Sequence, residues 1–578
     1  MVDQPEVIVR PVPHEAAERL ARDGLHPLMA RLMAARGVSD STELSADWKS
    51  LITPNRLSHI DEAALALAQA IEAGQHLMIV ADYDCDGATA CAVGLRGLRA
   101  LGAHVDYLVP NRFETGYGLS PEVVALAASH PSGKPDLIVT VDNGIASVDG
   151  VQAAKDHGID VIVTDHHLPG DQLPDALAIV NPNQPGCGFP SKNLAGVGVM
   201  FYVLMALRAT LRARGHFNDK PEPRLDHLVD LVALGTIADV VKLDTNNRLL
   251  VTRGLTRIRQ GQMQPGLRAL FAVCARDPAQ ASAFDFGFTI GPRINAAGRL
   301  TDMSLGIECL TTDDEDQALN LARELDRINQ ERRQIEGTMR EQAMACLADL
   351  ETDDRTDGQT DVQRAAICVY QHDWHQGVVG LVASRLKEKF WRPVVALAPA
   401  GDGTWRGSGR SIPDVHLRDV FDLISKRHPG LILKFGGHAM AAGLTLPEDG
   451  LSLFAQGFAD AVVEMTGKHH FTACIETDGS LETSWANVQT ATLLQQQVWG
   501  AGFPAPLFVD EFIVQSQRLV GSKHMKLSLT RDRQRFDAIW FNREEPLPER
   551  IRAVYRPTPN VWQSNITLQL VIETAKPV

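Results

Sequence analysis

MIVADYDCDG, residues 78–87, is the stretch that decides the fold. It opens with an apolar run typical of a buried strand, and small, helix-compatible residues follow it, so the pattern predicts a strand, a glycine turn and a helix. Asp82, Asp84 and Asp86 alternate, and side chains two positions apart in a strand point to one face. Carboxylates that close raise each other's pKa unless cations balance them. The pattern favours a catalytic divalent-metal site over a solvated turn or a helix–loop–helix calcium loop, which needs a distal Glu and does not follow a buried strand.

The composition is typical of a soluble globular chain with several domains. The 578 residues are too many for one core, and 44% of them are hydrophobic and 22% charged. No apolar run reaches the ~20 residues of a membrane span, and the N-terminal stretch lacks the apolar core of a signal peptide. The eight cysteines are scattered without a CxxC pair, which argues against a zinc ribbon or a disulfide framework. We expect a cytoplasmic protein with no membrane association.

The net charge of −15 argues by itself against a nucleic-acid-binding protein, but the charge is uneven. Residues 466–578 hold 12 Lys and Arg against 11 Asp and Glu, whereas residues 1–465 hold 44 against 60. Metal ligands would account for part of this acidity. Nucleic-acid binding would therefore require a local basic channel.

Residues 76–250 alternate β-branched runs with helical stretches, which predicts βαβ units and a mostly parallel sheet. In such sheets, ligands bind beyond the carboxyl ends of the strands. Asp142 follows one predicted strand, the cluster Asp165-His166-His167 follows the next, and Asp239 ends a predicted helix. Asp142 or Asp239 alone could be a helix cap, but in company with the other acidic groups each is a candidate ligand, and the two histidines are candidate ligands or acid/base groups. The predicted strands are 76–81, 105–109, 136–141, 160–164 and 178–180.

Two loops bounded by glycines have the composition of anion sites. Residues 111–118 contain Arg112 and Tyr117, and a second loop contains Arg293 and Arg299. The planar fork of arginine suits phosphate, although ordinary surface arginines would explain the pattern too. The sequence contains no GxxxxGK[ST] phosphate loop and so no motif of a nucleotide triphosphatase.

A long helix is predicted to bridge two domains. Residues 312–315, TDDE, have the pattern of a capping box that begins at Thr312. Helical spacing of apolar residues persists to about residue 350, which corresponds to ~55 Å of helix. The polar residues 351–362 are predicted to form a linker, and residues 1–60 are predicted to be helical and connective.

A second α/β unit is predicted at about 364–465. Its glycine pairs, in GSGRS with Arg410 and in GGHAMAAG at 436–443, expose backbone N–H groups that can form an anion cradle with a nearby Arg or His. This composition favours a substrate clamp over a second reaction centre.

The C-terminal residues 466–578 are predicted to form a small β-barrel. Basic residues lie among aromatic ones, a combination that can grip single-stranded nucleic acid, although a plain barrel core explains the aromatics equally well. The expected strands are 471–476, 508–515, 526–530, 536–541 and 566–572, and the basic residues are Arg518, Lys523, Lys526, Arg531, Arg533 and Arg535.

These motifs together resemble the DHH phosphoesterase superfamily. Asp165-His166-His167 is the motif that names it, DYDCDG, VDNG and GTIAD are similar to its other metal motifs, and GGHAMAAG is similar to its associated domain. The motif order, the long helix and the barrel resemble the branch of 5′→3′ exonucleases specific for single-stranded DNA. The resemblance covers nearly the whole chain, and residues 499–506 match it least well.

The resemblance implies a site for two divalent ions, Mn²⁺ or Mg²⁺, held by Asp82, Asp84, Asp86, Asp142, His166 and Asp239. Asp84, Asp142 and His167 would be catalytic, with His167 stabilising charge on the reacting phosphate or protonating the leaving 3′-oxygen. Substrate-binding residues would be Arg112, Tyr117, Arg293, Asn295, Arg299, Ser384, Arg410, Gly436, Gly437 and His438. The products would be 5′-mononucleotides, and the reaction would serve DNA repair and recombination.

The resemblance also suggests domain boundaries and partners. We expect an N-terminal helical segment at 1–60, a DHH catalytic domain at 61–305, a connecting helix and linker at 306–362, a DHH-associated domain at 363–465 and an OB-fold-like domain at 466–578. The partners would be single-stranded DNA and also a helicase and a single-strand-binding protein, with the chain acting as a monomer. Two alternatives stay open: a hydrolase of polyphosphate, short oligonucleotides or cyclic dinucleotides, and a catalytically inactive DNA-binding scaffold.

Overall fold

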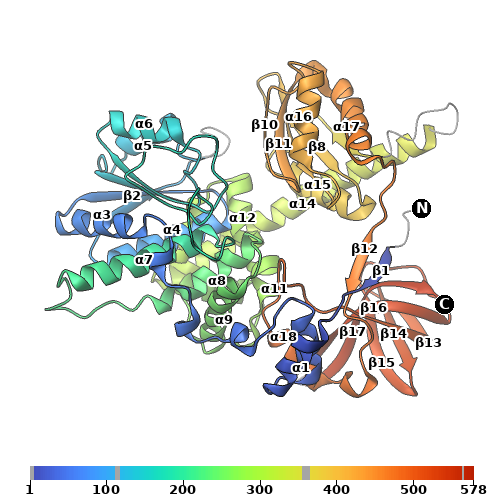
Figure 1. Cartoon of the computed structure of the whole chain (residues 1–578). Coiled ribbons are helices and arrows are strands. Elements are labelled where there is room, and N and C mark those ends of the chain that lie inside the picture. The colour runs from blue at the N-terminus through green and yellow to red at the C-terminus, as the bar shows by residue number, and fades with distance from the viewer. Residues whose placement is uncertain (1–4, 111–117, 354–364, 522, 563–564) are drawn as a thin grey trace. The chain divides into compact units, whose positions relative to one another are not determined.

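In the computed structural model, the chain forms two compact units (Figure 1). The larger unit comprises Val9–Ile328 and Thr477–Val578, and the smaller one comprises Met1–Ile8 and Asn329–Glu476. The structure describes residues 5–110, 118–353, 365–521, 523–562 and 565–578.

A five-stranded parallel sheet forms the framework of the larger unit, with the strand order β3-β2-β4-β5-β6. The predicted strands are confirmed to within one residue at each end. They are β2 His76–Ala81, β3 His104–Leu108, β4 Leu137–Val141, β5 Asp160–Thr164 and β6 Ala178–Val180.

Helices cover both faces of this sheet (Figure 1). Leu77 and Ile79 of β2 belong to the main core with α3, α4 and α7, whereas Met78 and Val80 belong to a second core with α5 and α6. Burial on both faces explains why the central strands β2 and β4 are mostly apolar. The covering helices are α3 Ile60–Glu72, α4 Cys85–Ala100, α5 Pro121–Ala128, α6 Val148–Asp156 and α7 Gly196–Ala213.

One described helix, α7, is long and apolar enough by length and composition to cross a membrane. However, 67% of it is buried inside the fold, where it packs against α3, α4 and α8. This burial is typical of the core helix of a globular domain.

The rest of the larger unit is mostly helical. The π-helical turn η6 leads directly into α12, whose residues approach the DYDCD segment. The remaining helices are α1 His14–Arg22, α2 Pro27–Ala34, α8 Val229–Ala238, α9 Thr245–Arg259, α10 Pro265–Val273, α11 Ala283–Asp285, η6 Phe286–Ile290, α12 Gly291–Leu300, α13 Ser304–Thr311 and α18 Val488–Gln496.

The C-terminal strands close into a barrel with the order β13-β14-β15-β17-β16, as predicted. Arg531 and Phe536 belong to its structure, because Arg531 pairs with Asp510 at 2.5 Å and its guanidinium lies 5.8 Å from the Phe536 ring centroid. For these two residues the barrel-core explanation therefore holds. The strands are β13 Phe508–Val520, β14 His524–Arg531, β15 Gln534–Trp540, β16 Arg550–Trp562 and β17 Asn565–Pro577.

Strand β16 was not predicted from the sequence, because Pro557 and Pro559 argue against a strand. In the structure β16 pairs with β13 only through residue 555, while its pairing with β17 continues to residue 562. The two prolines lie beyond the β13 pairing, on the part of β16 that has an open edge. Proline is tolerated in strands at such edges.

Two further predictions were wrong, one for the first strand of the barrel segment and one for residues 1–60. The strand predicted at 471–476 is β12 Cys474–Thr477, which pairs with β1 Glu6–Val9 outside the barrel. Residues 1–60 therefore contain a strand as well as helices. An isolated strand of four residues is too short to give a periodic signal of its own.

The smaller unit contains a five-stranded sheet of order β10-β11-β9-β8-β7, in which only β7 and β8 are parallel. Its main core cluster includes residues of α16 and α17, and α15 packs against β8 and β9. The elements are β7 Ile367–Tyr370, β8 Val394–Pro399, β9 Thr404–Arg410, β10 Lys434–Gly437, β11 Ala441–Pro447, α15 Val379–Phe390, α16 Leu417–Arg427 and α17 Leu451–Thr466.

The predicted long helix is confirmed as α14 Glu315–Asp353, with 39 residues. Its cap differs from the prediction. Asp314, rather than Thr312, accepts a hydrogen bond from the Gln317 N–H at 2.8 Å. Either residue type can cap a helix, and the helix starts too late for Thr312 to do so.

Candidate metal centre

Polar side chains follow three neighbouring strands of the parallel sheet. The segment with Asp82, Asp84 and Asp86 follows β2, Asp142 follows β4, and His166 belongs to the segment after β5. Because these strands are parallel and adjacent, their carboxyl ends meet at one edge. The side chains converge there as the sequence predicts.

The predicted metal ligands and His167 form three overlapping groups. Within each group, one oxygen or nitrogen per residue lies within 4.8 Å of the others. His166 Nε2 is 3.1 Å from Asp142 Oδ1, 3.5 Å from Asp239 Oδ2 and 4.0 Å from Asp86 Oδ2. The groups are Asp82, Asp84 and Asp142; Asp86, His166 and Asp239; and Asp142, His166 and His167.

Burial and crowding oppose full negative charge on three of the carboxylates, those of Asp86, Asp142 and Asp239. Asp86 and Asp142 are each 1% exposed. Burial, followed by the charge of Asp84, raises the pKa of Asp86 to about 7. Burial and the surrounding aspartates also raise the pKa of Asp142 and of Asp239. A divalent cation would remove this repulsion.

The buried Nε2 of His166 fits a metal ion. It makes no hydrogen bond to any described residue, and an unpaired polar atom in such a position is costly. Burial and the neighbouring His167 lower the pKa of His166 to about 4, so the ring is neutral, as a ligand must be. Carboxylate oxygens with one imidazole suit Mn²⁺ or Mg²⁺ better than they suit zinc.

Asp165 orients the histidine pair, a role that the sequence analysis did not assign. Its buried carboxylate accepts hydrogen bonds from the N–H groups of Ile145, His166 and His167 at 2.9, 2.7 and 3.0 Å. It also lies 2.8 Å from His167 Nδ1. Burial opposes protonation of His167, but the hydrogen bond and charge of Asp165 outweigh it and raise the pKa of His167 to about 9.

Two asparagines support the same segment and were also missed. Asn181 Nδ2 donates to the His167 carbonyl at 2.9 Å, and Asn183 Nδ2 donates to the His166 carbonyl at 2.6 Å. Asn181 directly follows strand β6. Applying the strand-end rule to that last strand would have found it.

The N-terminus of α7 lies against the carboxylates. Asp86 accepts hydrogen bonds from the N–H groups of Gly196 at 2.6 Å and Val197 at 2.9 Å, where the helix dipole favours negative charge. Gly196 is required at this point, because a Cβ there would lie 2.5 Å from Asp142 Oδ1.

Two residues of the site have positive φ. Asp142 has φ 63°, a conformation that Asp tolerates, whereas Val240, directly after Asp239, also has φ 63°. A β-branched residue in this region is strained, and strain of this kind clusters at functional sites.

The substrate-binding residues predicted for the larger unit have mixed placements. Arg112 and Tyr117 lie outside the described residues. Arg293 pairs with Asp326, with Nε 2.8 Å from the carboxylate, and Asn295 accepts a hydrogen bond from the Cys85 N–H at 2.8 Å. Asn295 therefore holds the DYDCD segment in place, and Arg299 lies in the last turn of the same helix, α12.

In the smaller unit, the predicted residues lie at one end of the sheet. Arg410, at the end of β9, donates to Ser408 Oγ at 2.9 Å, and its Nη2 lies close beneath Gly380. Ser384 Oγ donates to the Gly380 carbonyl at 3.1 Å. Gly436 and Gly437 belong to β10, and the exposed His438 follows them in the hairpin. Strand β11 pairs with both β9 and β10, so the hairpin and Arg410 share this end.

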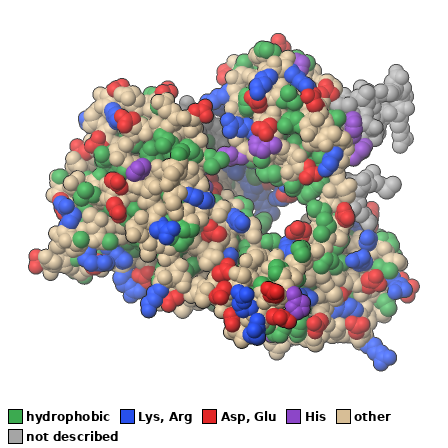
Figure 2. All heavy atoms as spheres, viewed as in Figure 1, with side chains coloured by type: hydrophobic (Ala, Val, Ile, Leu, Met, Phe, Trp, Pro, Cys, Tyr) green, Lys and Arg blue, Asp and Glu red, His purple; other side chains and the backbone are tan. Residues whose placement is uncertain are grey.

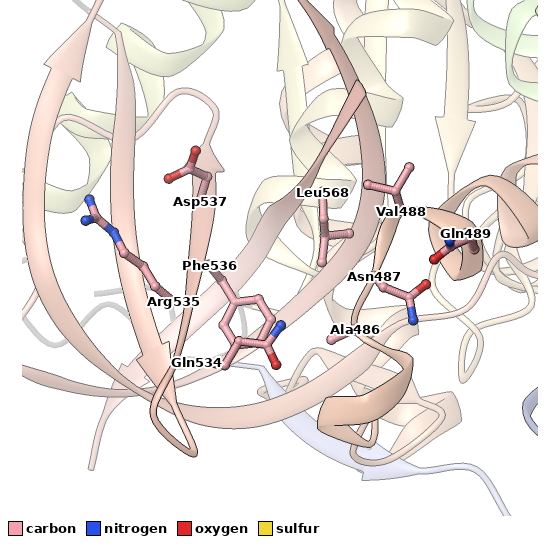
Figure 3. A pocket seen from close by; sticks show the side chains of 9 residues that line it. All are labelled: Ala486, Asn487, Val488, Gln489, Gln534, Arg535, Phe536, Asp537 and Leu568. Atoms are coloured by element: carbon pink, nitrogen blue, oxygen red, sulfur yellow. The ribbon is translucent and has the colours of Figure 1, made fainter. Parts of the chain in front are cut away.

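The barrel carries a separate pocket of about 580 Å³ between the start of α18 and strands β15 and β17 (Figure 3). No predicted metal ligand lines it. On the face of the barrel seen in Figure 2, basic and acidic side chains are interspersed. The pocket residues are Ala486, Asn487, Val488, Gln489, Gln534, Arg535, Phe536, Asp537 and Leu568.

Sequence comparisons match this arrangement along the chain. The model of the DHH family, N-terminal domain, matches residues 76–236, that of the DHHA1 domain matches 363–464, and that of the RecJ OB domain matches 477–574. Over 573 residues the chain is 48% identical to the single-stranded-DNA-specific exonuclease RecJ of Dickeya dadantii, covering 97% of this chain and 98% of that protein. This chain belongs to the RecJ family. RecJ of Escherichia coli (strain K12) is 46% identical, with 96% of each chain covered.

Solved RecJ structures share the fold and contain the expected metals. RecJ from Thermus thermophilus in complex with Mn²⁺ aligns with a TM-score of 0.80 and 28% identity, covering 99% of this chain and 79% of that one. The Mg²⁺ complex aligns with a TM-score of 0.76 and 27% identity, covering 99% and 78%. The RecJ architecture, with a DHH parallel sheet, a DHHA1 domain and a closed OB barrel, is therefore that of this chain.

Proposed function

We propose that this RecJ-family chain is a metal-dependent exonuclease that hydrolyses single-stranded DNA in the 5′→3′ direction and releases 5′-mononucleotides, acting in DNA repair and recombination. The observation that carries the proposal is the buried cluster of five carboxylates and one imidazole at the carboxyl ends of parallel strands. A scaffold that only binds DNA would have no need for such a costly arrangement.

Asp82, Asp84, Asp86, Asp142, His166 and Asp239 would hold two divalent ions, Mn²⁺ or Mg²⁺. When bound, such ions polarise the phosphodiester, activate water and neutralise charge on the attacking and leaving oxygens. The chain's own contribution is to fix these ligands on strand ends and helix termini, so that little reorganisation is needed during the reaction.

His167 would act on the reacting phosphate. Asp165 binds its Nδ1 and favours the protonated ring. A positively charged imidazole beside the metal ligands could donate to a non-bridging oxygen or to the leaving 3′-oxygen. Asp165 would then be a positioning residue, since it acts through His167.

Arginines and glycine-rich backbone would position the DNA. Arg112, Tyr117, Arg293, Asn295 and Arg299 would contact the 5′-terminal phosphate and nearby nucleotides, and α12 supports this role because it packs on the DYDCD segment. Ser384, Arg410, Gly436, Gly437 and His438 would form the phosphate cradle of the DHHA1 domain. The OB barrel would hold the single strand downstream, as OB folds commonly do.

The test uses one oligonucleotide labelled at either end, as a single strand and as a blunt duplex, with Mn²⁺, Mg²⁺ or chelator. We expect progressive loss from the 5′ end of the single strand only, and none with chelator. Asp142→Ala should abolish cleavage. Asp160→Ala is the matched control, because Asp160 is an exposed carboxylate at the opposite end of the neighbouring strand β5.

Other outcomes would overturn the proposal. Binding without cleavage under any metal would indicate a scaffold. Rapid cleavage of di- to tetranucleotides but not of long strands would indicate a scavenger of short oligonucleotides. Loss from the 3′ end would reverse the proposed polarity.

We also propose that the chain works as a monomer in the cytoplasm, on strands supplied by a helicase and covered by a single-strand-binding protein. One chain holds the complete ligand cluster, so a second copy is not needed to form the site. The eight cysteines, all in the described residues, are free thiols, as is usual in reducing compartments. Light scattering and pull-down with purified partners would test this.

A further inference from the structure

A second group of potential metal ligands lies at the amino end of the parallel sheet. The candidate metal centre described above lies at the opposite, carboxyl end. His76 and His104 are the first residues of β2 and β3 and are direct partners in the parallel register. Asp106 follows two residues after His104, on the same face of β3. One ligand atom from each of the three residues lies within 4.8 Å of the others.

We propose that His76, His104 and Asp106 form a binding site for a transition-metal ion of the zinc class, separate from the catalytic centre. Zinc is commonly bound by imidazole nitrogen and carboxylate oxygen with water in the fourth position. Two imidazoles distinguish this site from the oxygen-rich catalytic cluster and favour a softer ion than Mn²⁺ or Mg²⁺.

The spacing of the ligand atoms suits such an ion. His76 Nε2 lies 3.1 Å from Asp106 Oδ2, and tetrahedral zinc with bonds of about 2.0–2.1 Å separates its ligand atoms by about 3.3 Å. The rings of His76 and His104 lie face to face with centroids 4.6 Å apart. A simple ion pair with Asp106 would need only one imidazole, whereas ligand atoms of both rings lie within 4.8 Å of the carboxylate.

The site is held rigidly but is open to solvent. Asp136 Oδ2 accepts a hydrogen bond from the His76 N–H at 2.8 Å, which fixes the start of β2. His76 is 8% exposed, whereas His104 is exposed and the Asp106 side chain is 33% exposed. An ion could therefore enter from solvent and retain water, while the strands fix the ligand positions.

Polar neighbours support the carboxylate. Ser132 interacts with Asp106, and its hydroxyl lies 2.6 Å from His130 Nδ1. Burial opposes ionisation of Asp106, but the hydrogen bonds from Ser132 and His76 outweigh it and lower its pKa. Carboxylate ligands in metalloproteins are themselves commonly hydrogen-bonded in this way.

A bound ion would connect β3 to β2. Strand β3 is the edge strand of the sheet and has β2 as its single neighbour in the strand order. Crosslinking the first residues of the two strands would protect this edge from fraying. The site would therefore stabilise the DHH sheet without contacting the reacting atoms.

The test counts zinc in the full-length chain. Wild type, His104→Asn and His157→Asn are stripped with chelator, saturated with Mn²⁺, exposed to Zn²⁺, desalted and analysed for metal per chain. We expect wild type and His157→Asn to hold one more zinc per chain than His104→Asn. His157 is the matched control because it is an exposed histidine outside the cluster.

Two further variants make the result decisive. Asp106→Asn should lose the same zinc ion, and Ser132→Ala should weaken its binding by about 10- to 100-fold, the usual effect of removing a group that supports a ligand. Mn²⁺-dependent nuclease activity, measured before zinc is added, should be equal in all variants and shows that they are folded. Equal zinc in wild type and His104→Asn, or no zinc retained by wild type beyond the catalytic centre, would overturn the proposal.

Discussion

Gly196→Ala tests whether the start of α7 sets the geometry of the metal centre. A Cβ at residue 196 would lie 2.5 Å from Asp142 Oδ1 and 2.6 Å from Asp142 Cβ, whereas ordinary contacts begin at 3.4 Å. Either the helix or Asp142 must therefore move by about 0.9 Å. The N–H groups of Gly196 and Val197 that bind Asp86 would move with the helix.

Two effects on stability oppose each other in this variant. Alanine is the better helix former by up to about 1 kcal/mol, whereas an extra methyl group in a packed site costs about 1–3 kcal/mol. Because the contact is with a buried ligand that is also held by its neighbours, we expect a net loss of about 1–2 kcal/mol. A misplacement near 1 Å typically costs about 100-fold in rate, and we expect a loss of that size in kcat/KM.

The assay is Mn²⁺-dependent hydrolysis of a single-stranded oligonucleotide, together with urea unfolding of the same samples. Gly188→Ala is the matched control, since a Cβ there would meet no atom within 4 Å. We expect the control to keep wild-type activity. If Gly196→Ala also kept wild-type activity, or became more stable, α7 would not be packed on the ligands as described, and the reasoning would fail.

Asp165→Asn should lower kcat by about 10- to 100-fold, because it removes the charge that pairs with His167 while leaving the metal ligands in place; steady-state kinetics with metal-binding titration checks this. Asp142→Asn should raise the melting temperature of the metal-free protein, because it removes one crowded carboxylate. It should also reduce the stabilisation by Mn²⁺, which for an intact site is about 2.7 kcal/mol in the free energy of unfolding at 100 times Kd; calorimetry with and without Mn²⁺ checks both signs. Asp478→Ala should lower the free energy of unfolding by about 3–5 kcal/mol, because the buried Arg36, bound at 2.8 and 2.9 Å, would lose its counter-charge; chemical denaturation checks this.

Each of these variants has a matched control and an excluding outcome. Asp160→Asn, at the far end of the sheet, controls for the two sheet variants and should behave as wild type. Asp537→Ala, which removes an exposed carboxylate from β15, controls for Asp478→Ala. Unchanged kcat in Asp165→Asn would contradict the role of Asp165 in positioning His167. A lower melting temperature of metal-free Asp142→Asn would contradict the argument that the carboxylates repel one another. Wild-type stability of Asp478→Ala would contradict a stabilising buried ion pair with Arg36.

Local pattern was sufficient to place the parallel strands and the residues at their carboxyl ends. Buried strands such as 76–81 and 137–141 are mostly apolar, and an Asp directly after each one marks where the strand ends. The closed barrel and the long helix were predictable for the same reason, since hydrophobic periodicity is a property of neighbouring residues. Strand β16 was missed because proline is tolerated in a strand only where the edge is unpaired. Which part of β16 is unpaired depends on its pairing with β13 and β17, and the sequence of β16 alone does not show this.

The sequence by itself predicted the candidate ligand types, their order and the metal class, because carboxylates and one imidazole at strand ends limit the chemistry. Only the tertiary structure decided which of these side chains meet. Asp239 joins the cluster from the end of α8, Gly196 brings a helix N-terminus to Asp86, and Asp165 orients His167 instead of joining the ligand groups. The pairing of His76 with His104 and Asp106 likewise appears only when β2 and β3 are placed in register. These are contacts between segments far apart in the chain, and packing of the whole core fixes them, so no local pattern encodes them.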